Sequence, residues 1–390
     1  MDDLPLTKIL MVFLAILAIE GASTCLSSIG AVYKIPQTSF GNNPFIPNVI
    51  PGNLPELIKQ EGIPLVPQPW EDGMRTDPSQ ATWEWWYFEA VLEDNSTAIV
   101  VFFTKPFMTS SLPFTPFYSI TITTPNGTTI EDNVFISSHQ FNAARAFTND
   151  TMGDSWVRGD LNTYTLHMIS NKGLGADLTF IRQAPSSSLG GTGKWYFDPS
   201  QTQYFSWFIA MPYAKVDGTL TYNGQIHKVK GSGYHDHDWG TIDINKYLDH
   251  WHWTRAHVGN YTVDAWLLTA SALYNYQPMP YFYLAKGNQT LIEDMKYLTV
   301  QTFDNRTASN GVVYPSRVVF NWRNGTDSVN LSLTNPTILS NVNTAAITNS
   351  TSIGVPHYMR FKGNGTLNVN IAGLNVSGSV PEIWEINWAH

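Results

Sequence analysis

The stretch GYHDHDWG at residues 233–240 gathers two histidines, two aspartates and a tryptophan between glycines. In an extended strand the side chains alternate between two faces, so both histidines and the tryptophan would share one face and both aspartates the other. Neutral imidazole can bind a metal ion or exchange a proton near neutral pH, and a neighbouring carboxylate can orient it. This stretch is therefore the first candidate for chemistry in the chain.

A second histidine pair, His250 and His252 in HWHW, follows shortly after the first. Two His-x-His pairs on neighbouring strands would form a site for zinc, manganese or iron. No carboxylate or cysteine stands at a recognisable ligand spacing beside them, so we predict that the chain binds no metal.

A structural role accounts for the same residues. Buried histidines are commonly held by hydrogen bonds to carboxylates, which fix the chain around them. We expect the stretch to hold a junction between two domains in this way, with His235 and Asp236 structural. His237 and Trp239 would then face a ligand cavity.

The composition excludes nucleic acid as a partner. The chain has 390 residues and a net charge of −9, and only 14% of its residues are charged, so no basic face is available to neutralise phosphates. The length and the hydrophobic content of 43% are typical of two domains. Aromatic residues make up 13% of the chain, which favours a large core or a broad ligand cavity.

The N-terminal residues predict a protein of the secretory pathway. The apolar run at residues 9–19 is too short to span a bilayer and has the length of a signal-peptide core. We predict a signal peptide at residues 1–24, no integral membrane span after its cleavage, and a mature protein in the ER lumen or outside the cell. Cys25, the single cysteine, lies near the expected cleavage point, so the mature domain would have no internal disulfide.

Eleven N-x-S/T sequons support the same route, because N-glycosylation uses this acceptor in secreted chains. Several coincide with Asn-Gly pairs, where asparagine is favoured for its backbone conformation alone. The predicted glycosylation sites are Asn95, Asn126, Asn149, Asn260, Asn288, Asn305, Asn324, Asn330, Asn349, Asn364 and Asn375.

Short strands must position these residues. Residues 36–78 hold nine of the 23 prolines, which predicts an extended arm at residues 25–80, with one short helix at 54–62. From Trp83 onward the pattern changes to alternating and β-branched runs, which predict strands. The clearest runs are 97–104, 117–124, 218–222, 312–322 and 366–380, and Asn-Gly pairs at 126, 223, 324 and 364 predict hairpin turns between strands.

The predicted fold is all-β, with two antiparallel β domains after the proline-rich arm. A β-sandwich or barrel would occupy residues 81–230 and a second barrel residues 231–390, because the GSG at 231–233 breaks the pattern. The segments 83–102 and 251–270 both open with Trp-x-Trp and end in an apolar strand. This echo fits either a duplicated unit or two strands with aromatic inward faces.

Three segments together carry a family resemblance: GYHDHDWG, WEWWYF upstream of it and DAWLL at 264–268. They resemble the signature of the AttH-like, carotenoid 1,2-hydratase-like superfamily. The tryptophan-rich single-chain layout over about residues 75–390 is similar to the fungal lipocalin-like Diels-Alderases. The resemblance implies two calycin-type β domains, the second a lipocalin-like barrel. It also implies a cofactor-free enzyme that folds a linear polyene from a polyketide-peptide pathway into rings.

The hydratase relatives imply roles for His237, Trp239 and Asp264, the last as an acid that protonates an alkene before water adds. Those relatives carry a tyrosine two residues before the acid, where this chain has Thr262. Asp264 would need burial to raise its pKa enough to be a proton donor near neutral pH. An isoprenoid alkene hydratase or isomerase is therefore one alternative function, and a secreted lipid-binding protein without catalysis is another.

The Diels-Alderase relatives imply a different use of the chain. A [4+2] cycloaddition needs no nucleophile, so a protein assists it by holding diene and dienophile close together and by donating hydrogen bonds to the dienophile carbonyl. The resemblance implies that Glu84, His237 and Lys362 contact the polar head of the substrate. The aromatic residues expected to fold the hydrophobic polyene in a cavity between the two domains are Trp85, Tyr87, Trp239 and Trp266.

Overall fold

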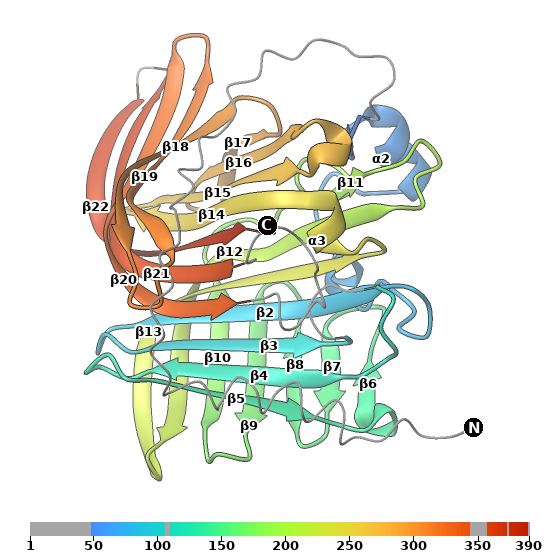
Figure 1. Cartoon of the computed structure of the whole chain (residues 1–390), viewed down its shortest axis with the longest axis vertical. Helices are drawn as coiled ribbons and strands as arrows, with labels where there is room; N and C mark the ends of the chain where they lie inside the picture. Colours follow the sequence, from blue (N-terminus) through green and yellow to red (C-terminus); the bar gives the residue numbers. More distant parts are fainter. Residues whose placement is uncertain (1–47, 106–109, 344–356, 373, 389–390) are drawn as a thin grey trace.

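A computed structural model describes residues 48–105, 110–343, 357–372 and 374–388 (Figure 1). The predicted signal peptide, Cys25, the first part of the arm and Asn349 lie outside the described residues. Almost all of the described chain is antiparallel strand, arranged in two large sheets. The predicted all-β fold of two antiparallel halves is confirmed.

The first sheet has 13 strands and is formed by the N-terminal half of the chain. Its main path runs in the order β5-β4-β3-β2-β13-β12-β10-β9-β8-β7-β6, and the short strand β11 joins β12 and in turn pairs with β1. The strands are β1 (Ile50–Pro51), β2 (Trp83–Leu92), β3 (Thr97–Phe103), β4 (Phe117–Thr123), β5 (Thr129–Phe135), β6 (Phe141–Ala143), β7 (Asn149–Met152), β8 (Ser155–Gly159), β9 (Thr163–Ile169), β10 (Gly175–Arg182), β11 (Lys194–Tyr196), β12 (Tyr204–Tyr222) and β13 (Gln225–Gly240).

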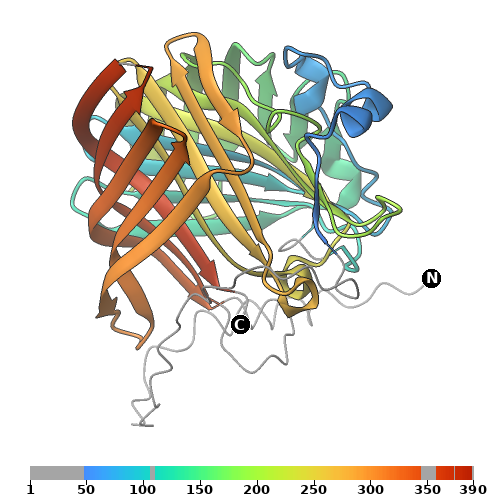
Figure 2. The same ribbon diagram turned by 90° about the horizontal axis from the view of Figure 1, so that it is seen from above.

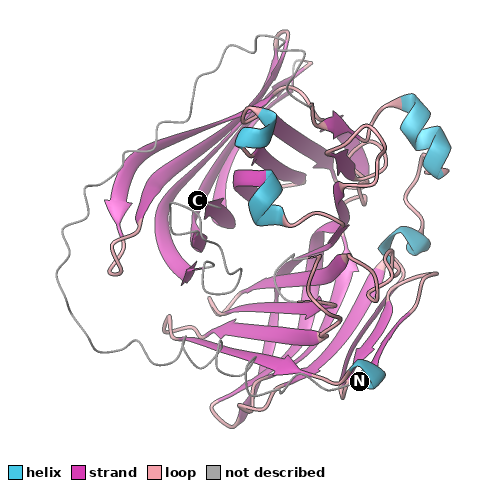
Figure 3. Ribbon diagram, turned by 45° about the vertical axis from the view of Figure 1, so that its right-hand side comes forward, coloured by secondary structure: helices cyan, strands magenta, loops and turns pink. Residues whose placement is uncertain are grey.

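The second sheet has nine strands in the order β17-β16-β15-β14-β22-β21-β20-β19-β18. It curves around its own interior (Figure 3), where Phe282 stacks on Trp322 with ring centroids 5.7 Å apart. The strands are β14 (Leu248–Val258), β15 (Tyr261–Ala270), β16 (Pro278–Lys286), β17 (Gln289–Asp294), β18 (Leu298–Thr307), β19 (Val313–Asn324), β20 (Asp327–Asn343), β21 (His357–Ile371) and β22 (Leu374–Trp388).

Helices are short in the described part of the chain. The helix predicted at 54–62 forms as α2 (Pro55–Glu61) and ends at Gly62, whose φ of 67° is the left-handed value that glycine adopts without strain. The others are η1 (Pro69–Asp72), η3 (Ser138–Gln140), α3 (Ile244–Tyr247) and η4 (Ala272–Tyr274). None of the described helices is long and apolar enough to cross a membrane.

The described chain has three apolar cores, one of which joins the two sheets. One lies inside the first sheet, where Trp86 and Phe88 of β2 are buried, and another lies inside the second sheet around Trp384. The third core joins the sheets, and in it Trp207 of β12 contacts Trp266 of β15 with ring centroids 4.0 Å apart. Figure 2 shows the two curved sheets side by side from above.

Three of the four predicted Asn-Gly turns are present. The pairs at Asn126, Asn223 and Asn324 join β4 to β5, β12 to β13 and β19 to β20. The prediction at Asn364 is wrong, because β21 runs through it without a turn. The preceding Gly363 allows close approach instead, since a Cβ there would lie 2.4 Å from the carbonyl oxygen of Thr334.

The change of sheet comes later than the predicted junction at residue 230. That residue lies inside β13, which stays in the first sheet through Gly240. The chain then passes through α3 and enters the second sheet at Leu248. The whole HDHDW stretch therefore belongs to the first sheet, at its border with the second.

Candidate functional site

A cavity of about 240 Å³ lies between the two sheets. Strands β2, β3, β4 and β13 of the first sheet line one side, and β14, β15, β21 and β22 of the second sheet line the other. The two segments with the Trp-x-Trp echo are hairpins, β2-β3 and β14-β15, and both contribute to the lining. The expected hollow between two β halves is present.

Aromatic side chains form much of the cavity wall. Trp85 and Tyr87 of β2 lie across from Trp253 of β14, whose ring meets the Tyr87 ring edge-on at 6.4 Å. Trp266 of β15 also lines the cavity, and its indole Nε1 has no hydrogen-bond partner in the described part of the chain. Three of the four aromatic residues expected at the ligand are thus in the wall, and Trp239 is not.

A polar cluster in the cavity wall was not predicted. Arg360 of β21 donates from Nε to Glu385 of β22 at 2.8 Å, and the Tyr358 hydroxyl donates to the same carboxylate. The Arg360 guanidinium also lies 5.4 Å from the centre of the Tyr87 ring, and Asn387 lines the cavity as well. Glu385 and Asn387 were visible only as polar residues within an apolar strand. A charge on the inward face of such a strand is the signal that could have identified them.

Two aspartates of β13 face the cavity. Asp236 accepts hydrogen bonds on one carboxylate oxygen from Trp207 Nε1 and from the Tyr234 hydroxyl, both at 2.8 Å. Burial raises the pKa of Asp236 even though these bonds favour its charged form. Burial also raises the pKa of Asp238 well above its usual value, and the neighbouring Asp236 raises it further. Sequence reasoning assigned Asp236 a structural role and overlooked Asp238.

The predicted acid Asp264 lies behind this wall, on β15 between the sheets. It is fully buried and accepts a hydrogen bond from Trp253 Nε1 at 3.2 Å, while its second oxygen has no partner among the described residues. Burial raises its pKa well above the usual value. Burial therefore favours its neutral form, but Asp264 does not line the cavity itself.

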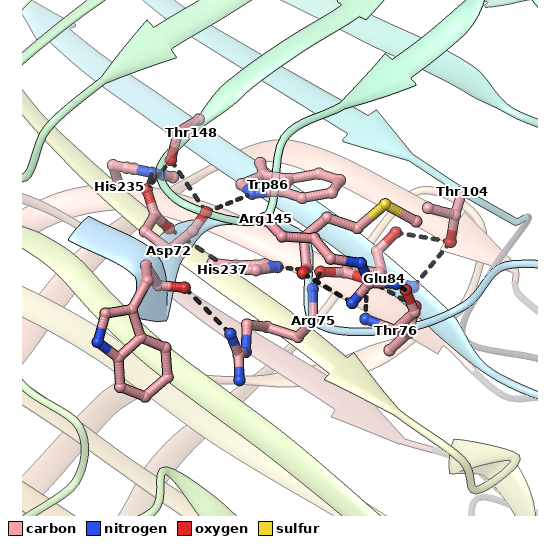
Figure 4. A network of polar contacts seen from close by, with 12 residues as sticks. Asp72, Arg75, Thr76, Glu84, Trp86, Thr104, Arg145, Thr148, His235 and His237 are labelled. Carbon is pink, nitrogen blue, oxygen red and sulfur yellow. Dashed lines mark hydrogen bonds and ion pairs between the residues drawn. The ribbon is translucent and has the colours of Figure 1, made fainter. Parts of the chain in front are cut away.

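The histidines of the HDHDW stretch lie on the opposite face of β13, inside the first sheet (Figure 4). His235 donates from Nδ1 to the Tyr87 carbonyl at 2.9 Å, and its Nε2 lies 3.0 Å from Asp72. His237 Nε2 lies 2.8 Å from Glu84, and all of these side chains are buried. Glu84 and His237 therefore do not line the cavity as expected. The strand alternation was right, but it is the aspartate face that meets the second sheet.

These contacts fix the arm to the first sheet. Glu84 accepts hydrogen bonds from the backbone N–H groups of Arg75 and Thr76, at 2.5 and 2.8 Å. Arg145 donates to the carbonyls of Met74 and Thr76 at 3.3 and 2.7 Å. We call Asp72, Glu84, His235 and His237 the arm clamp. The arm clamp fixes the arm to the first sheet, whereas the sequence analysis expected the HDHDW stretch to hold the domain junction.

Two other predicted contacts fall outside the cavity. Lys362 donates to the carbonyl of Asn95 at 3.2 Å and does not reach the ligand space. Trp239 packs beside His237, with ring centroids 4.8 Å apart, in the core of the first sheet. Both corrections follow from strand geometry, because Trp239 shares the face of His237 and Lys362 lies beyond the cavity along β21.

The two His-x-His pairs remain separate, since His250 and His252 lie on β14 of the second sheet. Burial and the neighbouring His250 lower the pKa of His252 to about 3, so its ring is neutral. Among the described residues, no group of three or more histidine, cysteine, aspartate or glutamate side chains could hold a metal ion.

Comparison with known proteins agrees with this architecture. The sequence profile of the family described as Diels-Alderase-like matches residues 74–337, which is more than half of the chain. The chain belongs to the Diels-Alderase-like family. The match covers strands β2 to β19 and the first part of β20, and with them Glu84, His235 and His237 of the arm clamp.

Individual relatives of this family member are distant. The quinolone epoxide rearrangement protein penF of Penicillium thymicola is 29% identical over 154 residues, which span 37% of this chain and only 40% of penF. A crystal structure of CghA with Sch210972 has a TM-score of 0.59 at 14% identity, covering 89% of this chain and 96% of CghA. Kievitone hydratase from Nectria haematococca has a TM-score of 0.55 at 16% identity, covering 88% and 98%. These two structures share the fold.

The buried acid Asp264 should make the stability of this Diels-Alderase-like protein depend on pH. Its pKa is higher in the folded chain than in the unfolded one, so its contribution is complete below about pH 4 and is lost as the pH rises. The side chain of Asp264→Asn cannot ionise, so the variant should not lose this contribution. Between about pH 5 and about pH 8, the free energy of unfolding of wild type should therefore fall by a few kcal/mol relative to that of Asp264→Asn. Urea unfolding at both pH values measures this. Asp154→Asn, at an exposed site, is the control, and parallel pH profiles for wild type and Asp264→Asn would contradict the assignment.

Proposed function

We propose that this chain is a cofactor-free Diels-Alderase that catalyses an intramolecular [4+2] cycloaddition of a linear polyene polyketide-peptide intermediate. The observation that carries the proposal is the aromatic cavity between the sheets, whose wall also contains the ion pair of Arg360 and Glu385. An apolar chain fits the aromatic part, and a polar head fits beside the ion pair. Membership of the Diels-Alderase-like family supports the proposal.

The cavity can lower the barrier by positioning. A flexible polyene loses conformational freedom when its diene and dienophile meet, and holding reacting atoms within contact distance can supply several kcal/mol of the barrier. The rings of Trp85, Tyr87, Trp253 and Trp266 provide rigid surfaces against which the polyene folds. Rigid aromatic walls therefore favour one folded shape over the others.

Hydrogen-bond donors in the wall can add electronic activation. Negative charge grows on the dienophile carbonyl oxygen in an asynchronous transition state, and a donor already aimed at that oxygen stabilises it. Trp266 Nε1 is buried and has no partner in the described part of the chain, so it can donate without breaking another bond. Arg360 donates to Glu385 from Nε only, which leaves its terminal nitrogens available within the described residues.

The test uses purified protein and a synthetic linear polyene that carries a conjugated diene and an α,β-unsaturated amide. The expected result is one stereoisomer of the ring product, formed faster than the spontaneous mixture. Lys362→Met is the matched control, because this cation lies outside the cavity, and it should leave the product ratio unchanged. Rates and ratios identical to those without protein would end the proposal.

A hydratase or isomerase of an isoprenoid alkene is the second candidate, and the neutral acids favour it. Asp238 faces the cavity with a raised pKa, and a carboxylic acid that keeps its proton near neutral pH can protonate an alkene. The structural neighbour named kievitone hydratase supports this alternative. Turnover in D₂O separates the two, since a protonated alkene acquires deuterium from solvent and a cycloaddition product acquires none.

A further inference from the structure

The two aspartates of β13 form a pair in the cavity wall. Asp236 and Asp238 alternate along the strand, so their side chains leave the same face, and both line the cavity. Asp238 lies opposite Trp85 of β2 and Trp207 of β12 in the sheet register. Both residues are buried, since only 7% of Asp236 and 5% of Asp238 is exposed.

Hydrogen bonding leaves one carboxylate oxygen of the pair without a donor. One oxygen of Asp236 already accepts from Trp207 and Tyr234, while the other, Oδ1, receives no donor from any other described residue. The carboxyl of Asp238 leaves the same face of β13 two residues further along, and the adjacent Asp236 raises its pKa. Two carboxyls can form a hydrogen bond only if one of them carries a proton.

Among the described residues, the charge of each nearby buried arginine is already balanced by a glutamate. Arg255 is paired with Glu89 at 2.6 Å, and Arg360 of the cavity wall is paired through Nε with Glu385 at 2.8 Å. Asp264 and Tyr234 approach from the same layer and bring no positive charge. The titratable and charged groups that line the cavity with the pair or interact with it electrostatically are Tyr87 of β2, Glu131 of β5, Tyr234 and His235 of β13, Asp264 of β15, Tyr358 and Arg360 of β21, and Glu385 of β22.

We propose that Asp236 and Asp238 share one proton, and that Asp238 presents it to the cavity as a hydrogen-bond donor to a carbonyl oxygen of the ligand. No proton is transferred in the cycloaddition, and the bond strengthens as charge grows on that oxygen. The pair carries a net negative charge, so this wall selects a neutral carbonyl over a free carboxylate. The role in catalysis rests on the proposed function, whereas the shared proton does not.

Infrared difference spectroscopy tests the shared proton without any substrate. Wild type minus Asp238→Asn at neutral pH should show the carbonyl band of a protonated carboxylic acid, and Asp154→Asn, an exposed control, should leave that band in place. Asp236→Asn is the second variant and should also remove or shift the band. Other buried acids such as Asp264 contribute equally to both proteins and cancel in the difference, so absence of a protonated-carboxyl band from the spectrum of wild type minus Asp238→Asn would overturn the proposal.

The donor is tested with Prodan, an apolar fluorophore whose emission shifts to the red when its carbonyl accepts a hydrogen bond. Bound emission should be red-shifted in wild type and in Asp238→Asn, which keeps an N–H donor, and blue-shifted in Asp238→Val. Equal emission from wild type and Asp238→Val would overturn the donor role.

Turnover of the synthetic polyene links the pair to the proposed function. Asp238→Val should slow the cycloaddition about 100-fold, and Asp238→Asn should retain most of the rate. If wild type leaves the polyene unconverted while the infrared band and the red shift are present, the proposed function fails and the shared proton stands. Normal turnover by Asp238→Val would remove Asp238 from the reaction.

Discussion

Replacing Asp72 by alanine is expected to lower the free energy of unfolding by at least about 3 kcal/mol. Asp72 is fully buried, and its carboxylate accepts hydrogen bonds from the hydroxyls of Thr148 and Tyr164 and contacts His235 at 3.0 Å. Burial alone would raise the pKa of Asp72, but the adjacent His235 and His237 outweigh burial and lower it. Alanine would leave the Tyr164 hydroxyl and His235 Nε2 buried without their carboxylate partner, while Thr148 would keep the backbone carbonyl of residue 72.

Urea unfolding of Asp72→Ala and Asp77→Ala provides a matched comparison. Asp77 lies on the same arm but is exposed, and its side chain bonds only to nearby Ser79, so its loss should cost less than about 1 kcal/mol. Asp72→Asn keeps the volume and one acceptor oxygen and should fall between wild type and Asp72→Ala. Equal stability of Asp72→Ala and Asp77→Ala would show that the arm clamp does not hold the fold.

The arm clamp also affects the cavity, because β13 carries both. The two histidines of β13 take part in the arm clamp, and the two aspartates that alternate with them line the cavity. When the clamp fixes the histidine face, it also fixes the position and rotation of β13, and so the position of the two carboxyls in the cavity wall. The dense chemistry of this stretch thus serves two faces of one strand.

Local patterns were sufficient to predict the all-β fold and several hairpins. Asn126 and Asn223 marked turns, and Trp85 and Tyr87, both expected at the ligand, line the cavity from one face of β2. Alternation says which side chains share a face, but the direction of that face depends on the second sheet. Glu84 and His237 were assigned to the cavity by the family resemblance, and both lie inside the first sheet.

Long-range partners could not be predicted from the sequence. The carboxylate that holds His235 is Asp72, 163 residues earlier in a proline-rich arm without periodicity. The pairing of Arg360 with Glu385 depends on the register of β21 and β22, which no single strand reveals. The same register brings Arg360 to the cavity in place of the predicted Lys362.

Val101→Trp is expected to abolish the acceleration of the cycloaddition and to return the product ratio to that of the spontaneous reaction. Val101 of β3 faces the cavity opposite Tyr87, so an indole there would occupy much of the space of about 240 Å³ that the polyene needs. A displacement of about 1 Å in bound geometry can already cost about 100-fold in rate, and exclusion of the folded polyene should cost at least that.

Chromatographic analysis of the ring products measures both the rate and the stereoisomer ratio. Val313→Trp introduces the same side chain at an exposed position of β19 and should leave both unchanged. The indole of Val101→Trp enters unfilled space, so the loss of stability should stay within about 1–3 kcal/mol and the variant should fold. Turnover by Val101→Trp with the wild-type product ratio would place the reaction outside this cavity, since a filled cavity cannot impose a shape on its guest.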